Sequence, residues 1–355
     1  MSDILEQWRN TIRAATTARR PLQLRGGGTK DFYGRQPAGE VFDTRYHRGI
    51  VSYEPTELVI TVRAGTPLAE LQATLAEQNQ WLAFEPPHFG EGATVGGTVA
   101  CGLSGPRRLA VGSLRDFVLG MKVMDGRGDV LSFGGQVMKN VAGFDASRLM
   151  AGSLGTLGLI LEVSLKVLPR PVMETTLRLD CDQATALAKM NEWGAEPLPV
   201  SATSWHGNVL HVRLSGARAA VEAALKQLGG TRVADDAASA HWADLREQRH
   251  TFFSEGDAPL WRFALPTTTP PLTLDGAQLV EWGGGQRWLR SSADPAALRA
   301  VATALGGHAT LFRGGDRSGE VFQQPAPALM DIHRRLKAGF DPAGIFNPGR
   351  FYDGI

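Results

Sequence analysis

The stretch that decides the fold class is residues 92–105, which read GATVGGTVACGLSG. Nearly every side chain in this run is small, and glycine is the usual residue where a backbone turns sharply or where another group approaches it closely. The pair Gly96 and Gly97 therefore indicates one of two arrangements. Either a flat ligand or a phosphate lies against the main chain here, or two backbone segments pack closely together.

A second glycine cluster lies upstream, where residues 25–30 read RGGGTK directly after a predicted strand over residues 21–25. Consecutive glycines allow several backbone N–H groups to converge on one anion. Thr29 adds a hydroxyl donor to the same loop. Taken alone, this cluster would also be explained by an ordinary glycine turn between two strands.

Two more glycine-containing segments follow downstream. Residues 112–116 read GSLRD and lead into a predicted hairpin, in which apolar runs at residues 117–124 and 130–133 flank an Asp-Gly turn. Residues 139–160 read KNVAGFDASRLMAGSLGTLGLI. No G-x-G-x-x-G run follows a strand and opens a helix, so the Rossmann dinucleotide-binding fingerprint is absent from the sequence.

In this order and at this spacing, the four segments resemble the FAD-binding domain of the vanillyl-alcohol-oxidase superfamily, the PCMH-type FAD-binding fold. The resemblance covers most of residues 20–170. Residues 340–350 read FDPAGIFNPGR, which is typical of the D-lactate dehydrogenase and glycolate oxidase branch of that superfamily. The short second domain and the absence of other catalytic motifs look closest to the FAD-binding accessory subunits of bacterial glycolate oxidases.

We therefore expect an α+β protein built from two domains and a tail. The resemblance implies a two-subdomain PCMH-type FAD-binding domain over residues 1–170. Residues 171–325 are expected to form a ferredoxin-like α+β cap domain, and residues 326–355 a C-terminal tail that returns to the FAD domain.

The cap reads as a repeated unit. Predicted elements from residue 174 to residue 233 follow the βαββαβ order of a ferredoxin-like unit. Residues 260–312 look like a second copy whose first helix has been replaced by the loop at residues 266–276. Two such units can pair their sheets edge to edge, so the pattern predicts one large sheet under a layer of helices.

The resemblance also implies roles for individual residues. One side of the FAD pyrophosphate would be held by Gly26, Gly27, Gly28 and Thr29, and the other side by Thr94, Gly96, Gly97 and Thr98. The flavin would be lined by Gly102, Ser104 and Gly105. The flavin ring or the adenine end would be faced by Asp116, Gly152, Ser153, Gly158 and Ile160. Backbone N–H groups can satisfy a diphosphate without a dedicated cation, and an apolar isoalloxazine ring needs a flat wall.

Two departures from the superfamily pattern matter. Members with covalently attached flavin often carry His at the last glycine of the first loop, where this chain has Gly28, so we expect non-covalent FAD. Many relatives read G-S-E-G-T-L-G in the fourth segment, and here Leu154 replaces the acidic residue. Any role of that carboxylate is therefore lost.

Catalytic residues are not identified by the sequence. Oxidation of a 2-hydroxy acid needs a clamp for the substrate carboxylate and a base for the hydroxyl proton. The weak candidates are His88, His333 and Arg313, and for each an ordinary packed or exposed side chain is the simpler interpretation. His206 and His211 fall on a predicted hairpin, on opposite faces or strands, and we expect no metal site.

Composition limits the classes of partner that the chain could bind and the compartment in which it would work. Lys and Arg number 37 against 36 Asp and Glu, a net charge of +1 that gives no argument for binding nucleic acid or an acidic membrane. The two cysteines, Cys101 and Cys181, are too few for an iron–sulfur cluster and fit a reducing cytoplasm. No run is apolar enough to span a bilayer, so contact with the inner membrane would come through partners.

The leading hypothesis is the FAD-binding subunit of a glycolate oxidase. Such a complex oxidises glycolate to glyoxylate, and the resemblance implies a larger FAD-containing subunit, an iron–sulfur subunit and quinone as the electron acceptor. The alternatives are an autonomous FAD-linked dehydrogenase of D-2-hydroxy acids such as D-lactate, or a catalytically silent assembly subunit.

Overall fold

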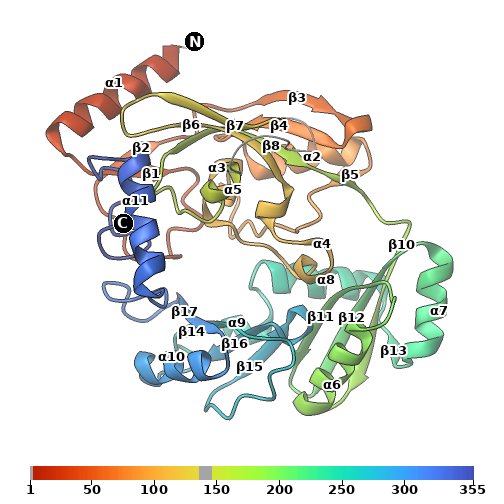
Figure 1. Ribbon diagram of the computed structural model, residues 1–355. Helices are drawn as coiled ribbons and strands as arrows, with labels where there is room; N and C mark the ends of the chain where they lie inside the picture. Colours follow the sequence, from red (N-terminus) through yellow and green to blue (C-terminus); the bar gives the residue numbers. More distant parts are fainter. Residues whose placement is uncertain (1–2, 136–145) are drawn as a thin grey trace. The chain divides into compact units, whose positions relative to one another are not determined.

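The computed structural model describes residues 3–135 and 146–355, and the chain forms two compact units (Figure 1). Unit 1 consists of Met1–Leu103, Ser113–Pro169 and Arg317–Ile355, and unit 2 of Ser104–Gly112 and Arg170–Asp316. Residues 139–145 of the fourth glycine-containing segment lie outside the described part of the chain.

The units differ from the three sequence blocks at two places. Ser104–Gly112 groups with unit 2, and its short helix α4 (Arg108–Val111) contacts strand β11 (Val200–His206) there. The segment that returns to unit 1 begins at Arg317 rather than at residue 326. Both differences arise from tertiary contacts, which local sequence patterns do not encode.

The main sheet of unit 1 has five antiparallel strands in the order β3-β4-β8-β6-β7. Its strands are β3 Ile50–Glu54, β4 Val59–Arg63, β6 Val118–Met124, β7 Val130–Gly134 and β8 Leu159–Lys166. The Asp-Gly turn joins β6 to β7 with Met124 opposite Val130, so the predicted hairpin is confirmed. Strand β8 is central, and its apolar residues Leu159–Leu161, Val163 and Leu165 are all buried.

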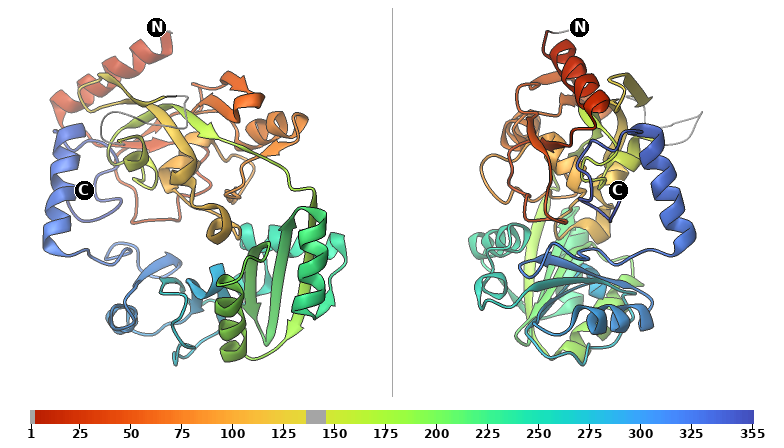
Figure 2. Two further views of the ribbon diagram at one scale, coloured as in Figure 1. Left: turned by 45° about the vertical axis from the view of Figure 1, so that its right-hand side comes forward. Right: turned by 90° about the vertical axis from the view of Figure 1, so that its left-hand side faces the viewer.

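Helices cover this sheet and the small pairs of strands beside it (Figure 2). They are α1 Asp3–Ala18, η1 Pro55–Glu57, α2 Leu68–Glu77, α3 Val95–Cys101, η2 Leu114–Phe117, α5 Ser147–Met150 and α11 Pro327–Phe340. Helix α1 buries Trp8 and Ile12 in a cluster that also contains Phe42, Met124 and Phe346, so both ends of the chain contribute to one core.

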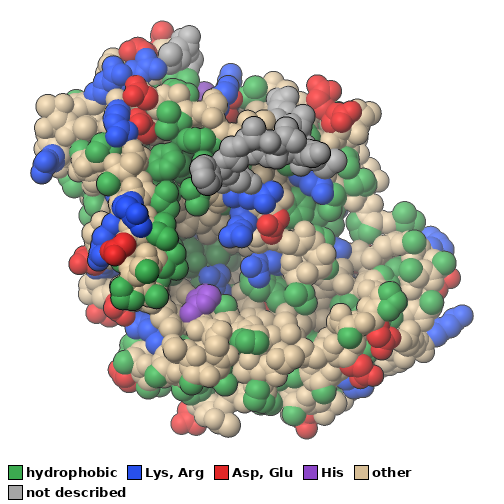
Figure 3. Space-filling view, in the orientation of Figure 1, with side chains coloured by type: hydrophobic (Ala, Val, Ile, Leu, Met, Phe, Trp, Pro, Cys, Tyr) green, Lys and Arg blue, Asp and Glu red, His purple; other side chains and the backbone are tan. Residues whose placement is uncertain are grey.

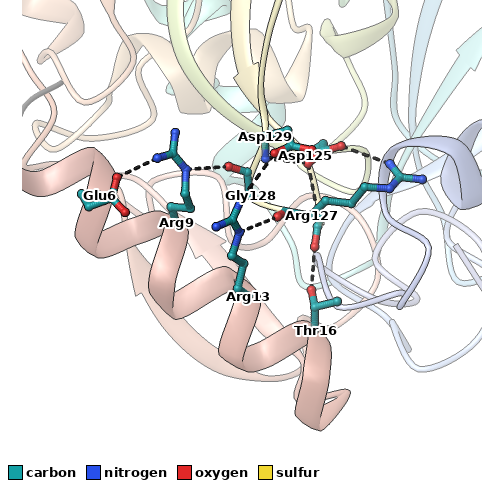
Figure 4. A network of polar contacts seen from close by, with 9 residues as sticks. Glu6, Arg9, Arg13, Thr16, Asp125, Arg127, Gly128 and Asp129 are labelled. Carbon is teal, nitrogen blue, oxygen red and sulfur yellow. Dashed lines mark hydrogen bonds and ion pairs between the residues drawn. The ribbon is translucent and has the colours of Figure 1, made fainter.

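Polar contacts also hold α1 onto the β6–β7 turn (Figure 4). The side chains of Arg9 and Arg13 donate hydrogen bonds of 3.0 Å to the backbone oxygens of Gly128 and Arg127, respectively. Thr16 donates at 2.6 Å to Gly126 O. The helix thus satisfies carbonyl groups that a tight turn leaves unpaired.

Two short strand pairs complete unit 1. Strands β1 (Leu22–Arg25) and β2 (Glu40–Asp43) are parallel, and Leu22 also bridges to Phe346 of the C-terminal segment. Strands β5 (Gln80–Trp81) and β9 (Leu168–Pro169) are antiparallel. Strand β1 delivers the chain directly into the first glycine loop.

Unit 2 contains one eight-stranded antiparallel sheet in the order β13-β10-β12-β11-β15-β16-β14-β17. Its remaining strands are β10 Met173–Asp180, β12 Val209–Gly216, β13 Thr231–Arg232, β14 Leu260–Ala264, β15 Gln278–Glu281, β16 Gln286–Arg290 and β17 His308–Arg313. The two halves meet where β11 pairs with β15, and read outward from that junction both have their second, third, first and fourth strands in that order. The expected edge-to-edge pairing of two ferredoxin-like units is therefore confirmed.

The helices of unit 2 are α6 Gln183–Gly194, α7 Arg218–Leu228, α8 Asp235–Arg246, α9 Thr251–Ser254, η3 Trp282–Gly284 and α10 Pro295–Ala304. Asp182 caps α6, because its side chain accepts a hydrogen bond from Thr185 N. Within the described residues no helix lies between β14 and β15, as the loop in the second copy predicts. Helices α8 and α9 do not join into one helix, because Gln248 between them has a positive φ of 54°.

Figure 3 shows one face of the molecule, where apolar side chains gather along α11. Leu329 and Ile332 lie one turn apart on this helix, and 48% and 46% of their surfaces are exposed. No helix in the described ranges is long and apolar enough to cross a membrane.

Candidate functional site

A pocket of about 80 Å³ in unit 1 brings together three of the four glycine-containing segments and the C-terminal motif. Its walls include the loop Gly26–Asp31, Thr94 and Gly97 at the start of α3, Leu154, and finally Asn347 with Arg350. A volume of this size admits a phosphate group, not a whole dinucleotide. The pocket is therefore suited to the anionic part of a larger ligand.

The first glycine loop needs its glycines for steric reasons. A Cβ atom on Gly27 would lie only 1.4 Å from the backbone oxygen of Gly92, and one on Gly26 would lie 2.3 Å from Thr94 Oγ1. Gly28 has a φ of +73°, a conformation that side chains with a Cβ atom rarely adopt. The loop therefore packs directly against residues 92–94 of the second segment. Two segments that bind the same ligand have to be neighbours in this way.

The backbone N–H groups of this loop are available for a ligand. Among the described residues, Gly26, Gly27 and Gly28 donate no backbone hydrogen bond to another part of the chain. Buried or half-buried N–H groups normally have a partner. A bound anion would provide one, so the residues present fit a phosphate at this position.

Cationic side chains surround the same loop, in contrast to the expectation that backbone donors alone would suffice. Lys30 is 7% exposed, and its Nζ lies 3.2 Å from the backbone oxygen of His88. Arg25 pairs with Asp31 at 2.7 Å, and Arg350 is also buried beside the loop. Three cations against one carboxylate give the pocket a positive potential, which favours a diphosphate.

The second segment is the N-terminal turn of helix α3, and its backbone donors are already engaged. Val95 N donates to Thr66 O at 2.9 Å, and Gly96 N donates to Ala64 O at 2.7 Å. Thr94 caps the helix by accepting a hydrogen bond from Gly97 N at 3.2 Å. Helix α3 therefore offers the pocket side-chain and Cα surface but few of the free N–H groups that we expected.

Close packing explains the glycines of this second segment. A Cβ atom on Gly96 would lie 2.7 Å from Ala64 Cβ, and one on Gly102 would lie 2.9 Å from Gly152 N. One polar atom remains open, because Thr98 Oγ1 is buried with no hydrogen-bond partner in the described part of the chain. Of the two arrangements that the sequence allowed at Gly96, the geometry shows backbone packing.

The described part of the fourth segment rests on the C-terminal end of α3. Gly152 N donates to Val99 O at 3.0 Å, and Leu154 N donates to Ala100 O at 2.8 Å. Ser153 Oγ donates to Met150 O at 2.9 Å and is therefore used in a turn. Leu154 occupies the pocket wall at the position where relatives often carry an acidic residue.

The remaining residues predicted to bind the cofactor lie in structural positions outside the pocket. Asp116 accepts hydrogen bonds from Ser113 N and Oγ at 2.8 and 2.7 Å, and so caps η2. Burial acts to raise the pKa of Asp116, but these hydrogen bonds outweigh it and hold the pKa below its usual value. Gly158 packs against Met124 O, and Ile160 is a buried residue of β8.

Ser104 and Gly105 belong to unit 2, although the sequence placed them with the flavin. The backbone oxygen of Gly105 accepts a hydrogen bond of 3.1 Å from Trp282 Nε1. Arg108 lies over the ring of Trp282 at 4.4 Å. These contacts explain why this segment groups with the cap.

None of the three weak catalytic candidates is among the residues that line this pocket in the described part of the chain. His88 Nε2 lies 2.8 Å from Gln72 Oε1. The ring of His333 packs on Phe351 and Tyr352, and burial lowers its pKa. Arg313 lies in β17 of unit 2, where burial and then Arg290 lower its pKa.

Four histidines of unit 2 form a cluster on one face of the sheet, against α8 and α9. His206 and His211 lie on neighbouring strands, as expected, and on the same face, because His211 pairs with Ser204 across β11 and β12. The rings of His211 and His241 are 4.0 Å apart. Within the described residues, no three metal-ligating side chains are placed to hold an ion.

Sequence reasoning missed three pocket residues. Lys30, Asn347 and Arg350 were quoted within motifs, but no role followed from their types alone. The signal was available in the C-terminal FNPGR run, whose asparagine and arginine meet the first loop only after the chain has returned from unit 2.

Two family models of FAD-binding proteins match the segments that form this pocket. Residues 5–134 match the family model for the FAD binding domain, and residues 314–351 match the model for the C-terminal domain of FAD linked oxidases. The two matches together cover the first loop, α3 and the returning tail.

Individual relatives match over nearly the whole chain. The glycolate oxidase subunit GlcE of Escherichia coli (strain K12) is 47% identical over 98% of this chain and 96% of its own length. The glycolate oxidase subunit GlcD of Bacillus subtilis (strain 168) is 26% identical over 94% of this chain and 84% of its own length. An alkyldihydroxyacetonephosphate synthase has a similar fold, with a TM-score of 0.65 at 14% identity over 96% of this chain and 73% of that one.

The cofactor follows from these matches and from the pocket. An open set of glycine N–H groups beside three cations suits the diphosphate of FAD. Gly28 leaves no side chain at the position of the covalent histidine, which is consistent with non-covalent attachment. The chain therefore belongs to the family of FAD-linked oxidases that contains the glycolate oxidase subunit GlcE, and it is an FAD-dependent oxidoreductase.

Proposed function

We propose that this chain is the FAD-binding subunit of a complex that oxidises glycolate to glyoxylate. The observation that carries the proposal is the 47% identity to a glycolate oxidase subunit across 98% of the chain. We further propose that electrons pass from its flavin to an iron–sulfur partner and then to quinone. FAD supplies the two-electron acceptor for this chemistry.

The chain's own residues bind and orient that cofactor. We propose that the N–H groups of Gly26, Gly27 and Gly28 donate to the diphosphate, while Lys30 and Arg350 supply positive charge. Thr29, Thr94, Gly97 and Thr98 would complete the walls around it. The proposed lining of the flavin and adenine ends remains Gly102, Ser104, Gly105, Asp116, Gly152, Ser153, Gly158 and Ile160.

The proposed partners follow from what the chain lacks in its sequence. Two cysteines are too few to ligate an iron–sulfur cluster, so a second chain has to hold it. The homology to both GlcE and GlcD supports a complex with a larger flavin-containing subunit. Any membrane contact, at the inner membrane, would be made through these partners.

The test is the visible spectrum of the purified chain, alone and with its partner subunits, before and after glycolate is added without oxygen. We expect flavin absorbance in the isolated chain and loss of that absorbance on adding glycolate only when the partners are present. FAD should leave the protein on acid precipitation, because its attachment is non-covalent.

The competing functions predict different results in these measurements. Bleaching of the isolated chain by D-lactate or glycolate would show an autonomous 2-hydroxy-acid dehydrogenase. A folded chain that never takes up FAD would be an assembly subunit. A complex whose turnover is unaffected when the first loop no longer binds FAD would contradict a catalytic role for this flavin.

A further inference from the structure

We propose that Asn347 and Arg350 are positioning residues for the cofactor: they fasten the first glycine loop and the strand before it through backbone groups, so that docking of the C-terminal segment and binding of FAD stabilise each other. This inference rests on the proposed placement of the diphosphate at Gly26–Thr29. It adds a role for the tail that does not require the tail to carry out chemistry.

Asn347 joins two pocket walls with a single side chain. Its Oδ1 accepts a hydrogen bond of 2.8 Å from Leu24 N, and its Nδ2 donates one of 2.6 Å to Leu154 O. Its own N–H donates to Leu22 O at 3.0 Å. Only 5% of the residue is exposed. Strand β1, which leads into the glycine loop, is thereby tied to the segment that rests on α3.

Arg350 holds the other end of the loop. Its guanidinium donates to the backbone oxygens of Arg35, Asp31 and Lys30 at 2.9, 3.1 and 3.4 Å. Arg317, at the start of the returning segment, donates to Asp31 O and to Gly34 O, both at 2.8 Å. Carbonyl oxygens that are occupied by guanidinium donors are not available to face a phosphate.

The tail also has anchors that do not involve the pocket. Lys337 Nζ and Asp341 Oδ2 form a buried ion pair of 2.8 Å, and Lys337 Nζ donates to Phe346 O at 2.8 Å. Asp341 in turn accepts hydrogen bonds from the backbone N–H groups of Ile345 and Phe346. Removing the amide of Asn347 should therefore loosen the loop and leave the tail attached.

If the tail and FAD stabilise one loop conformation, their coupling is reciprocal. FAD should slow exchange of the tail amides, and a weakened tail contact should lower FAD affinity by the same factor. If Asn347 and Arg350 only supported the fold, replacing them would lower stability without coupling FAD affinity to the protection of the tail amides.

The first experiment measures FAD affinity of the full chain by flavin fluorescence for Asn347→Ala and Arg350→Gln. The matched control is Asn191→Ala, because the Asn191 side chain also bridges two backbone groups, with Nδ2 donating to the oxygens of Leu187 and Thr267, but does so in unit 2. We expect each pocket variant to raise the Kd by about tenfold, as the loss of one buried hydrogen-bonded bridge predicts. The control should change the Kd by less than about twofold.

The second experiment follows hydrogen exchange of the amides at residues 345–350 in the wild-type chain with and without FAD. We expect FAD to slow exchange there by about tenfold and to leave helix α6 unchanged. This arm needs no variant, so it decides the question even if a substituted chain fails to fold.

The outcomes separate this strap, the fastening of the first glycine loop by Asn347 and Arg350, from the proposed function. Unchanged FAD affinity in Asn347→Ala and Arg350→Gln, or no protection of the tail by FAD, overturns the strap while FAD binding stands. A wild-type chain that binds no FAD overturns both. An equal loss of affinity in Asn191→Ala would show a general stability effect and would also overturn the strap.

Discussion

Two glycine-rich segments meet beside the pocket, and they use their backbones in opposite ways. In the first, Gly26–Gly28, the N–H groups have no partner among the described residues. In the second, the N–H groups of Val95, Gly96 and Gly97 all have acceptors within the chain. Similar composition therefore produces an anion site in one segment and a packing surface in the other.

The difference comes from what precedes each segment. The first loop follows a strand that ends at Arg25, and its N–H groups donate to no carbonyl group among the described residues. The second begins a helix, and the carbonyl groups of Ala64 and Thr66 beyond strand β4 reach its first turn. Glycine allows the close approach in both cases, but the neighbouring acceptors decide whether a ligand is needed.

The largest effect on FAD binding is expected for Gly27→Ala. The new Cβ atom would overlap the backbone oxygen of Gly92, which cannot move as a flexible side chain does. We expect the variant to lose bound FAD and to lower the free energy of unfolding by about 3 kcal/mol or more, the upper range for overpacking. The flavin-to-protein absorbance ratio and urea unfolding of the FAD-free chain measure the two effects.

The matched control for this prediction is Gly194→Ala in helix α6. No atom lies within 4 Å of the added Cβ there, and helical glycine costs about 0.5–1 kcal/mol relative to alanine. The control should be neutral or slightly more stable, with normal flavin content. Normal flavin content in Gly27→Ala would mean that the first loop is not the cofactor site.

A smaller effect is expected for Gly96→Ala, and it should fall on stability rather than on cofactor affinity. Its Cβ atom would lie 2.7 Å from Ala64 Cβ, so we expect a loss of about 1–3 kcal/mol in the free energy of unfolding. Adding Ala64→Gly removes that contact, and the double variant should recover part of the loss.

The readouts are urea unfolding of the FAD-free chain and FAD affinity after correction for the folded fraction. If Gly96→Ala weakened FAD binding as strongly as Gly27→Ala without a change in stability, both segments would bind the ligand directly. The first segment would then not differ from the second as an anion site differs from a packing surface.

The smallest effect on FAD binding is expected from acid, which should destabilise unit 2 most, where His211 and His241 lie. Burial, followed by neighbouring positive charges, lowers the pKa of His211 to about 4 and of His241 to about 3. Below the ordinary histidine pKa of about 6.5, the unfolded chain binds protons that the folded chain refuses. This contribution to stability is therefore fully present above about pH 7 and is lost as the pH falls toward about 3; at pH 5, about 1.5 units below the unfolded pKa, each of the two histidines removes about 2 kcal/mol.

Urea unfolding at pH 7.5 and pH 5, with hydrogen exchange to locate the change, tests this prediction. The described pocket walls contain no histidine, so FAD affinity should change little over the same range. A loss of FAD affinity with unit 2 intact would show that the titration reaches the glycine segments.

Local patterns were sufficient for most of the framework. The Asp-Gly turn predicted the β6–β7 hairpin, because its backbone twist matches that of paired strands. Alternation of helices and strands predicted the two ferredoxin-like halves of unit 2 and the missing helix between β14 and β15.

The site was predicted only in part. The first loop was identified, but the engagement of Gly96 by Ala64, the position of Ser104–Gly112 in unit 2 and the histidine cluster were not. Each depends on a partner far away in the sequence. Glycine spacing shows where the backbone can be approached and does not show by which group.

The sequence by itself determined the cofactor class, the order of the elements and the positions where glycine is required, because these depend on local backbone geometry and on motif order. Only the tertiary structure decided which donors stay open and which residues hold the loop. Asn347 reaches Leu24 and Leu154 only after the chain has passed through unit 2 and returned. Hydrogen bonds act over a few ångströms of space regardless of sequence separation, so their partners follow from the fold.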